Sequence, residues 1–312
     1  MYSVGGKDKQ SEQKTIILLE NIKILAKRKE AFIKQYSTKM ITFIRLNRVI
    51  TFDKQQYLDM YPTEPRYIDI ENTNHIVIFI HGIVEGPDQF TQLIDISVAM
   101  GYAAAALLLP GHGGSGKDFA VHNKETWQEH VRQQIDYYRK RYTNIILVGH
   151  SMGSLLSLLA YTEDTKQIRG IIVIDTPLYV RVKWRAIRNN LKIGFCSHIP
   201  EDDPAFALLQ ASSVAPCSVF RYLTWAPRII DLFHLMGRTR KILQKINIPT
   251  LVIHADRDEL VSTSSVQVFE HKLPKSYQVI VRLPHSTHFR YAKEDLDTLH
   301  THFRQFIQNL NL

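Results

Sequence analysis

The chain has 312 residues, 45% of them hydrophobic, which suits one large domain or a domain with an insertion. No stretch approaches the ~18 consecutive apolar residues that span a bilayer, and the N-terminus lacks an apolar signal-peptide core. The two cysteines, Cys196 and Cys217, have no metal-ligand spacing and are too few for a disulfide scaffold. These features predict a cytoplasmic protein and argue against a transmembrane or disulfide-rich one.

The formal net charge of +9 is unevenly distributed along the chain. Residues 1–70 carry 13 basic and 8 acidic side chains (+5), residues 178–249 carry 11 and 4 (+7), and the remainder carries 15 and 18 (−3). Basic segments attract anionic membranes, nucleic acid or acidic substrates. The alternative is two ordinary solvent-exposed surfaces rich in lysine and arginine.

The N-terminal 75 residues differ from the rest in pattern. Residues 15–36 predict a basic amphipathic helix, which packs on the domain, lies on a membrane surface or meets a partner. Two β-rich pieces, 41–44 and 48–52, predict an antiparallel edge of a sheet. Residues 60–75 are polar, carry two prolines and predict a loop.

From Ile76 onward, apolar runs alternate with helical patterns. The predicted strands cover residues 76–80, 103–109, 144–148, 171–174, 250–254 and 278–281. The predicted helices cover residues 88–100 (with Asp88 as N-cap), 124–142, 154–161, 261–273 and 293–312. This alternation predicts an α/β fold with a mostly parallel sheet and helices on both faces. In such sheets ligands bind at the carboxyl ends of the strands, so chemistry is expected in the loops that follow them.

The loop after the third of these strands has the pattern G-x-S-x-G, from Gly149 to Gly153. A strand before it and a helix after it are typical of a nucleophile elbow, which exposes a serine on a sharp turn. The glycines let neighbouring backbone approach without a Cβ clash. Ser151 is therefore the candidate nucleophile, and the alternative is a glycine-rich turn without chemistry.

The loop after the first strand, His81-Gly82-Ile83, predicts an oxyanion hole. Its glycine lets the backbone turn, so that the Ile83 N–H points into the site beside the Met152 N–H. The alternative is an ordinary glycine turn at the end of a strand.

The loops after the last two strands supply a candidate acid and base. Asp256, Asp258 and Glu259 follow one strand, and we prefer Asp258 because Asp256 lies too close to the strand. These acids could instead only cap the next helix. His285 and His288 follow the other strand, and we prefer His288 as the general base, with His285 as the fallback.

The order serine, aspartate, histidine along the chain is that of the α/β-hydrolases. The sequence resembles the serine α/β-hydrolases over residues 76–310, in particular the bacterial carboxylesterase and monoacylglycerol lipase-like branch. The motifs that carry the resemblance are Ile80-His81-Gly82, Pro110-Gly111-His112-Gly113, Gly149-His150-Ser151-Met152-Gly153, Asp258 with Val261, and Ser286-Thr287-His288.

The resemblance implies that Ser151 is the nucleophile, Asp258 the acid and His288 the base, with Ile83 and Met152 as oxyanion donors. The chain departs from the family at Thr287 and Ala255, where glycine is usual or common. We also assign four residues beside these motifs to the substrate pocket: His81, Phe90, His150 and Val261. No metal site or cofactor is expected, because no H-E-x-x-H or H-x-x-E-H spacing occurs.

Residues 178–249 interrupt the alternation, at the position where the family carries a cap. We therefore expect an N-terminal extension (1–75), a core (76–177 and 250–312) and a helical lid (178–249). Apolar side chains of the lid suit an acyl-chain pocket, although most fill its own core. They are Phe195, Phe206, Leu208, Phe220, Tyr222, Trp225, Phe233, Leu235 and Met236.

The expected function is hydrolysis of an acyl ester, such as a monoacylglycerol or lysolipid, through an acyl-enzyme. The alternatives are a thioesterase or peptidase with the same triad, or a silent hydrolase fold that only binds. The expected partners are a small ester or lipid substrate and a membrane surface contacted through the basic segments, but no nucleic acid.

Overall fold

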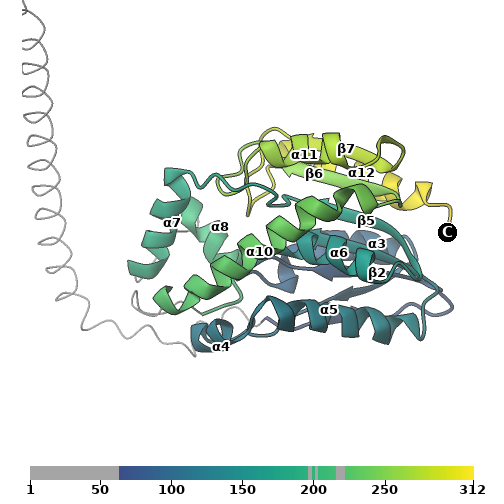
Figure 1. Cartoon of the computed structure of the whole chain (residues 1–312), viewed down its shortest axis with the longest axis horizontal. Coiled ribbons are helices and arrows are strands. Elements are labelled where there is room, and N and C mark those ends of the chain that lie inside the picture. The colour runs from purple at the N-terminus through teal and green to yellow at the C-terminus, as the bar shows by residue number, and fades with distance from the viewer. Residues whose placement is uncertain (1–62, 196–198, 201–202, 216–221) are drawn as a thin grey trace, which may run out of the picture. The chain divides into compact units, whose positions relative to one another are not determined.

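Seven strands form one sheet in the order β1-β3-β2-β4-β5-β6-β7 (Figure 1). All neighbouring strands are parallel except β1, which pairs antiparallel with β3 at one edge. The mostly parallel sheet predicted from the alternating pattern is therefore confirmed. The strands are β1 (Arg66–Ile68), β2 (His75–Ile80), β3 (Ala103–Ala106), β4 (Asn144–His150), β5 (Ile168–Ile174), β6 (Thr250–Ala255) and β7 (Gln278–Leu283).

The computed structural model of the chain describes residues 63–195, 199–200, 203–215 and 222–312. The predicted N-terminal helix, the two predicted edge pieces and both cysteines lie outside these residues. Within the described part of the chain, no helix has the length and apolar character needed to cross a membrane.

Helices cover both faces of the sheet, as the sequence predicts. Helices α3 (Thr91–Ala99) and α12 (Lys293–Asn309) pack on one face. The other face is covered by α5 (Lys124–Arg139), α6 (Met152–Glu163) and α11 (Ser264–Lys272). Both faces exclude water, which explains why the central strands are apolar throughout rather than alternating.

The central strand β2 shows how one apolar run serves two cores. Ile76, Ile78 and Ile80 contribute to the core beneath α5 and α6, whereas Val77 and Phe79 contribute to the core beneath α3 and α12. All five side chains are fully buried. This alternation follows from the two-residue period of a strand.

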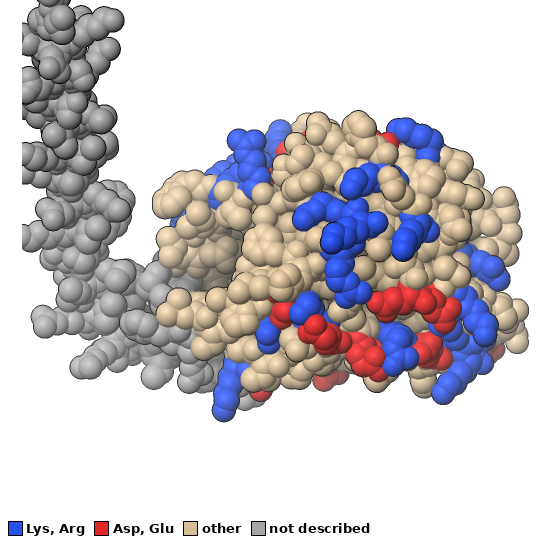
Figure 2. All heavy atoms as spheres, viewed as in Figure 1, with Lys and Arg blue, Asp and Glu red and all other residues tan. Residues whose placement is uncertain are grey.

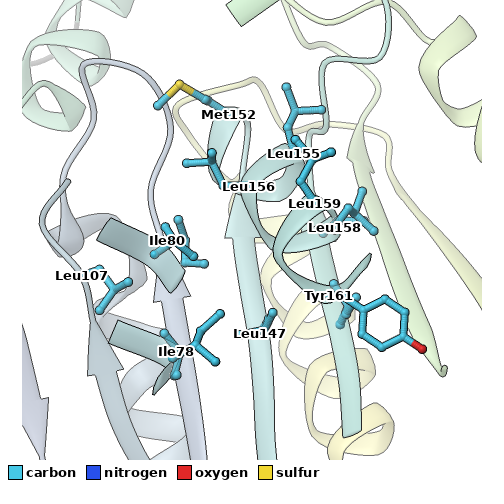
Figure 3. Packing of buried hydrophobic residues seen from close by; sticks show 14 of the residues in the cluster. Ile78, Ile80, Leu107, Leu147, Met152, Leu155, Leu156, Leu158, Leu159 and Tyr161 are labelled. Carbon is cyan, nitrogen blue, oxygen red and sulfur yellow. The ribbon is translucent and has the colours of Figure 1, made fainter. Parts of the chain in front are cut away.

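Helix α6 packs directly over the centre of the sheet, with its leucines and Met152 above the strands (Figure 3). Its first turn also lies against the end of β2, because a Cβ atom at Gly153 would overlap the carbonyl oxygen of Ile80. A Cβ at Gly149 would overlap the Ser154 amide nitrogen. The two glycines of the G-x-S-x-G pattern therefore permit the close backbone contacts expected from the sequence.

The order of the strands places a topological switch point between β2 and β4. From β2 the chain turns outward to β3 on one side, and it then returns to form β4 on the other side. The loops after β2 and β4 therefore diverge from adjacent strands and leave a crevice at the carboxyl edge, where ligands bind in such sheets. These are the loops with Ile83 and Ser151.

Residues 178–249, here called the inserted segment, connect β5 to β6. Its helices include α7 (Trp184–Phe195), α8 (Pro204–Ala211) and α10 (Ala226–Ile242). Helix α10 packs along α6, and α7 packs against α8 (Figure 1). That this segment acts as a lid stays a prediction.

Two local predictions were wrong, and one helix was not predicted. Asp88 does not cap a helix but lies within a 3-10 turn, η2 (Pro87–Phe90), where its carboxylate pairs with Arg66. Residues 66–68 of the predicted loop form β1, since they pair with the edge of β3. Helix α4 (Gly116–Val121) was missed, although Ser115 and Asp118 form a capping box at its start.

We predict that Gly153→Ala lowers the free energy of unfolding by about 1–3 kcal/mol, because the new methyl group must displace the end of β2. Gly237→Ala in α10 is the matched control, since its Cβ would approach nothing closer than Arg240 Nη2 at 3.8 Å. That helical substitution should raise stability by about 0.5–1 kcal/mol. Urea denaturation measures both, and equal effects would contradict the close-contact argument.

Candidate active site

Ser151 lies at the tip of the turn between β4 and α6 in a strained backbone conformation. Its φ of 50° and ψ of −119° are unfavourable for a residue with a Cβ, so the surrounding structure must hold it. The Ser151 N–H donates to the Ile174 carbonyl at 2.9 Å, and Ser154 Oγ donates to the Gly149 carbonyl at 2.7 Å. The elbow is thus fixed by hydrogen bonds to β5 and within the turn itself.

His288 and Asp258 form a hydrogen-bonded pair beside the elbow. His288 Nδ1 lies 2.6 Å from Asp258 Oδ2, and both side chains are almost completely buried. Asp258 Oδ1 accepts the amide N–H groups of Leu260 and Val261 at 2.7 and 2.8 Å. The carboxylate is therefore held on one side by its own loop, and it orients the imidazole with the other oxygen.

The pair alters the basicity of His288. Burial by itself lowers the pKa of His288, but the charge of Asp258 and its hydrogen bond outweigh burial and raise this pKa above its ordinary value. A histidine with a raised pKa is a better proton acceptor near neutral pH. The arrangement suits a general base.

The other ring nitrogen of His288, Nε2, faces a carboxylate that the sequence did not single out. Glu85 Oε1 lies 3.6 Å from Nε2. Ser151 Oγ makes no hydrogen bond within the described residues, so the structure brings nucleophile and base into one region without joining them. Catalytic hydrogen bonds are often long in structures without substrate.

The two residues that we ranked lower lie elsewhere. Asp256 forms a surface ion pair with Arg282 at 2.6 Å. His285, whose side chain is 46% exposed, lies 3.2 Å from Asp295. The structure therefore pairs Asp258 with His288, and not Asp256 or His285.

The loop after β2 carries the candidate oxyanion donor Ile83. No acceptor for the Ile83 N–H occurs among the residues described, and Met152 is the first residue of α6, whose N–H has no acceptor within the helix. Val84 has a φ of 58°, which is rare for a β-branched residue, and its N–H donates to His112 Nε2 at 3.1 Å. Ser213 of the inserted segment donates its N–H to the Val84 carbonyl at 2.8 Å.

His81 and Phe90, which we assigned to the substrate pocket, are instead built into the interior. The Leu109 N–H donates to His81 Nε2 at 3.0 Å, and His81 Nδ1 donates to the Gly82 carbonyl at 2.8 Å. Burial lowers the pKa of His81 to about 4, so its ring is neutral. Phe90 packs against Phe79 in the core, with ring centroids 5.2 Å apart. Both side chains are therefore engaged in contacts within the protein.

Val261 and His150 lie close to the catalytic candidates. Val261 is buried and holds Asp258 through its amide N–H. His150 precedes the nucleophile and is buried, with its Nδ1 2.8 Å from Glu85 Oε2 and its Nε2 3.8 Å from Asp175 Oδ2. Both side chains are buried beside the candidate residues, and the contacts seen for them are with other protein groups.

Sequence reasoning missed Glu85 and Asp175. Both are buried carboxylates in loops that follow strands of the parallel sheet, β2 and β5. A position in a loop after a strand could have pointed to these two residues, since the same kind of position identified the other candidates. It was not sufficient, because no pattern of spacing connects Glu85 with a histidine 65 residues later.

Two groups of side chains bring metal-ligand atoms within 4.8 Å of one another: Glu85, His150 and His288, and Asp175, Asp258 and His288. Each group contains a pair at hydrogen-bonding distance, 2.8 Å for Glu85 with His150 and 2.6 Å for Asp258 with His288. Ligands around zinc, with bonds of about 2.0–2.1 Å to nitrogen and oxygen, stand further apart than these pairs. The geometry is that of a hydrogen-bond network.

Comparisons with known proteins show what the chain resembles as a whole. A family model described as serine aminopeptidase, S33, matches residues 71–199. A thermostable monoacylglycerol lipase of Bacillus sp. (strain H-257) is 26% identical over 235 residues, covering 75% of this chain and 90% of that enzyme. A carboxylesterase of Bacillus subtilis (strain 168) is 21% identical over 258 residues, covering 79% and 98%.

A solved structure reported with LipS and LipT, two metagenome-derived lipolytic enzymes, has the same fold. Its TM-score is 0.63 at 18% identity, and the match covers 80% of this chain and 98% of that one. The seven-stranded sheet, the helices on both faces and these similarities agree with one another. The chain has the α/β-hydrolase fold, and in sequence it resembles monoacylglycerol lipases and carboxylesterases.

Proposed function

We propose that the protein hydrolyses carboxylic esters through an acyl-enzyme on Ser151. The observation that carries the proposal is the Asp258–His288 hydrogen bond of 2.6 Å. The two residues follow the last two strands of the sheet, and the serine elbow follows its central strand, β4. The similarity to a monoacylglycerol lipase and a carboxylesterase supports a lipase-like or esterase-like activity.

In the proposed reaction, Ser151 Oγ attacks the ester carbonyl carbon while His288 Nε2 takes the serine proton. Asp258 stabilises the imidazolium that forms. The carbonyl oxygen becomes negative in the tetrahedral intermediate and is stabilised by the N–H groups of Ile83 and Met152. The intermediate collapses as His288 gives its proton to the departing alcohol. Water, activated by His288, then releases the acid and restores Ser151.

The outer surface of the inserted segment supports a lipid-like substrate. Helix α7 buries Ala186 and Asn189, and exposes Trp184, Ile187 and Leu191 beside its arginines. Trp184 is 70% exposed, which is unusual for so large an apolar side chain. Over the N-terminal half of α10 the surface is largely uncharged (Figure 2). Apolar side chains with basic neighbours suit contact with an anionic lipid surface.

The same segment is joined to the loops of the candidate site, which supports a role as a lid. Lys183 donates its N–H to the Glu259 carbonyl at 2.8 Å, and Ser213 donates to the Val84 carbonyl at 2.8 Å. Ala215 donates to the Gly114 carbonyl at 2.9 Å. A segment tied to the acid loop and the oxyanion loop lies where it can select substrates.

We predict that a fluorophosphonate probe labels the protein, and that Ser151→Ala abolishes labelling because the probe reacts only with an activated serine. Gel fluorescence or intact mass measures the adduct. Ser157→Ala is the matched control, since Ser157 Oγ is buried in α6 and donates to the Gly153 carbonyl at 2.9 Å. Labelling that persists in Ser151→Ala would overturn the assignment, and absence of labelling in the wild type would favour a silent binding protein.

We predict that His288→Ala lowers kcat/KM on p-nitrophenyl esters by about 10³–10⁴-fold or more, because the general base is lost. His285→Ala should change it less than about threefold, since that half-exposed ring contacts Asp295. In the wild type, kcat/KM should rise with pH through a midpoint above ~6.5, because neutral His288 is required and its pKa is raised. Equal losses in the two variants would contradict our choice of base.

Thioester and peptide substrates in the same assay distinguish the alternative activities.

We predict that Trp184→Ser weakens binding to anionic phospholipid vesicles by severalfold without changing hydrolysis of a short, water-soluble ester. Tyr137→Ser is the control, because Tyr137 is 64% exposed on α5, outside the inserted segment. Vesicle sedimentation at low and high salt measures binding, which salt should weaken. Equal binding of wild type to neutral and anionic vesicles at low salt would contradict the role of charge.

A further inference from the structure

A buried histidine–carboxylate pair joins the oxyanion loop to the nucleophile elbow. Glu85 lies on the loop after β2, and His150 is the residue before the nucleophile. Glu85 Oε2 lies 2.8 Å from His150 Nδ1, and only 2% of either side chain is exposed. The two loops that must act together on one carbonyl group are therefore connected by a contact that excludes water.

The same carboxylate oxygen also fixes the backbone of its own loop. Glu85 Oε2 accepts the Gly82 N–H at 2.7 Å and a proton of Gln89 Nε2 at 3.0 Å. A Cβ atom at Gly82 would overlap the Glu85 carboxylate, so only glycine allows the carboxylate to reach this amide. The next residue is Ile83, whose N–H is the proposed oxyanion donor. Glu85 thus sets the path of the backbone immediately before that donor.

A second carboxylate lies on the far side of the His150 ring. Asp175 Oδ2 is 3.8 Å from His150 Nε2 and has no hydrogen-bond partner among the described residues. Asp175 has a φ of 48°, and its Oδ1 accepts the Ala255 N–H at 2.7 Å. The ring nitrogens of His150 therefore face carboxylates from two different strand ends.

Other titratable groups surround the pair. The His288 ring lies 4.9 Å from the His150 ring, and His254 Nδ1 lies 3.3 Å from Asp175 Oδ1. Tyr291, which is partly buried, lies nearby, and desolvation raises its pKa well above the ordinary range. His81, which is neutral, lies on the side of the oxyanion loop. Near neutral pH these neighbours leave the two carboxylates as the nearest countercharges of His150.

We propose that His150 is an imidazolium at neutral pH and, through Glu85, positions the oxyanion loop against the nucleophile elbow. This inference rests on the proposed serine hydrolase function. It assigns a positioning role to both residues, since neither needs to contact the reacting atoms. A neutral histidine has one ring donor, whereas the charged form presents a donor to each flanking carboxylate.

Electrostatics support the charged form. Burial alone lowers the pKa of His150, but Glu85 and Asp175 outweigh it and raise this pKa to about 10. The pKa of Glu85 is lowered, although burial opposes this, mainly by the charge of His150. Charge-assisted hydrogen bonds are stronger and less easily bent than neutral ones, so such a pair holds a loop more firmly than two neutral groups would.

The two members of the pair have opposite effects on the basicity of His288. His150 opposes protonation of His288, while Glu85 favours it. Glu85 and His150 together place a negative and a positive charge beside His288, and the two charges shift the pKa of His288 in opposite directions. Without His150, the Glu85 carboxylate, 3.6 Å from Nε2, would favour a proton on Nε2. Nε2 could then not accept the proton of Ser151.

Kinetics of variants test the positioning role. Glu85→Gln and His150→Gln should each lower kcat on a p-nitrophenyl ester by about 10–100-fold, with KM changed less than about threefold, because a misplaced oxyanion donor weakens only the transition state. The double variant should be no slower than the slower single one, since the residues act as a unit. Asp231→Asn in α10 is the matched control, because it removes a buried carboxylate that pairs with Lys124 of α5 and Arg228 of α10.

Losses in kcat that multiply in the double variant, or that Asp231→Asn reproduces, would overturn the proposal. If Glu85→Gln or the double variant fails to fold, a spectroscopic measurement on protein that retains both Glu85 and His150 keeps the proposal testable. In ¹⁵N-histidine-labelled Ser151→Ala protein, His150 should show both ring nitrogens protonated up to a pH of about 10. His150→Gln assigns the signal, and a neutral ring at pH 7.5 would overturn the proposal.

The two proposals fail in different ways. If the wild type neither reacts with the fluorophosphonate probe nor hydrolyses esters, the proposed function fails, yet the charge state of His150 is still measurable. If the wild type is active and Glu85→Gln is as fast as Asp231→Asn, the function stands and the positioning role fails.

Discussion

The structure depends on the close approach of the first turn of α6 to the carboxyl end of β2. Gly153 permits it, because any Cβ there would overlap the Ile80 carbonyl oxygen. This contact brings the elbow with Ser151 beside the loop with Ile83, at the point where the strand order reverses. The candidate acid and base follow β6 and β7, which lie on the opposite side of β4 from β2. One backbone contact therefore sets the frame within which the other candidate groups meet.

The loops that follow the strands hold unusual conformations and buried charge together. Val84, Ser151 and Asp175, which follow β2, β4 and β5, all have positive φ without being glycine. Such conformations persist only where the surroundings enforce them. Here polar contacts hold them: the Val84 N–H donates to His112 Nε2, the Ser151 N–H donates to the Ile174 carbonyl, and Asp175 Oδ1 accepts the Ala255 N–H. The strain and the buried network are two aspects of one preorganised region.

The inserted segment contacts the loops after the strands on one side and is exposed to solvent on the other. Its backbone hydrogen bonds reach the loop after β2 through Ser213 and the loop after β6 through Lys183. Its outer face carries exposed apolar side chains such as Trp184 beside basic residues. On the face shown in Figure 2, acidic side chains gather over α5 and basic ones lie above them. The net positive charge of the chain is therefore not spread evenly over the surface. The inserted segment carries an excess of basic side chains.

The sequence by itself determined the sheet, its parallel character and the elbow, because period and apolar runs are local properties that neighbouring residues share. It also indicated Asp258 and His288, since both follow a strand. Tertiary structure alone decided that Asp258 rather than Asp256 contacts His288, and that Phe90 belongs to the core rather than the pocket. It alone joined Glu85 to His150 and Asp175, because contacts between loops of different strands depend on strand order and not on spacing along the chain.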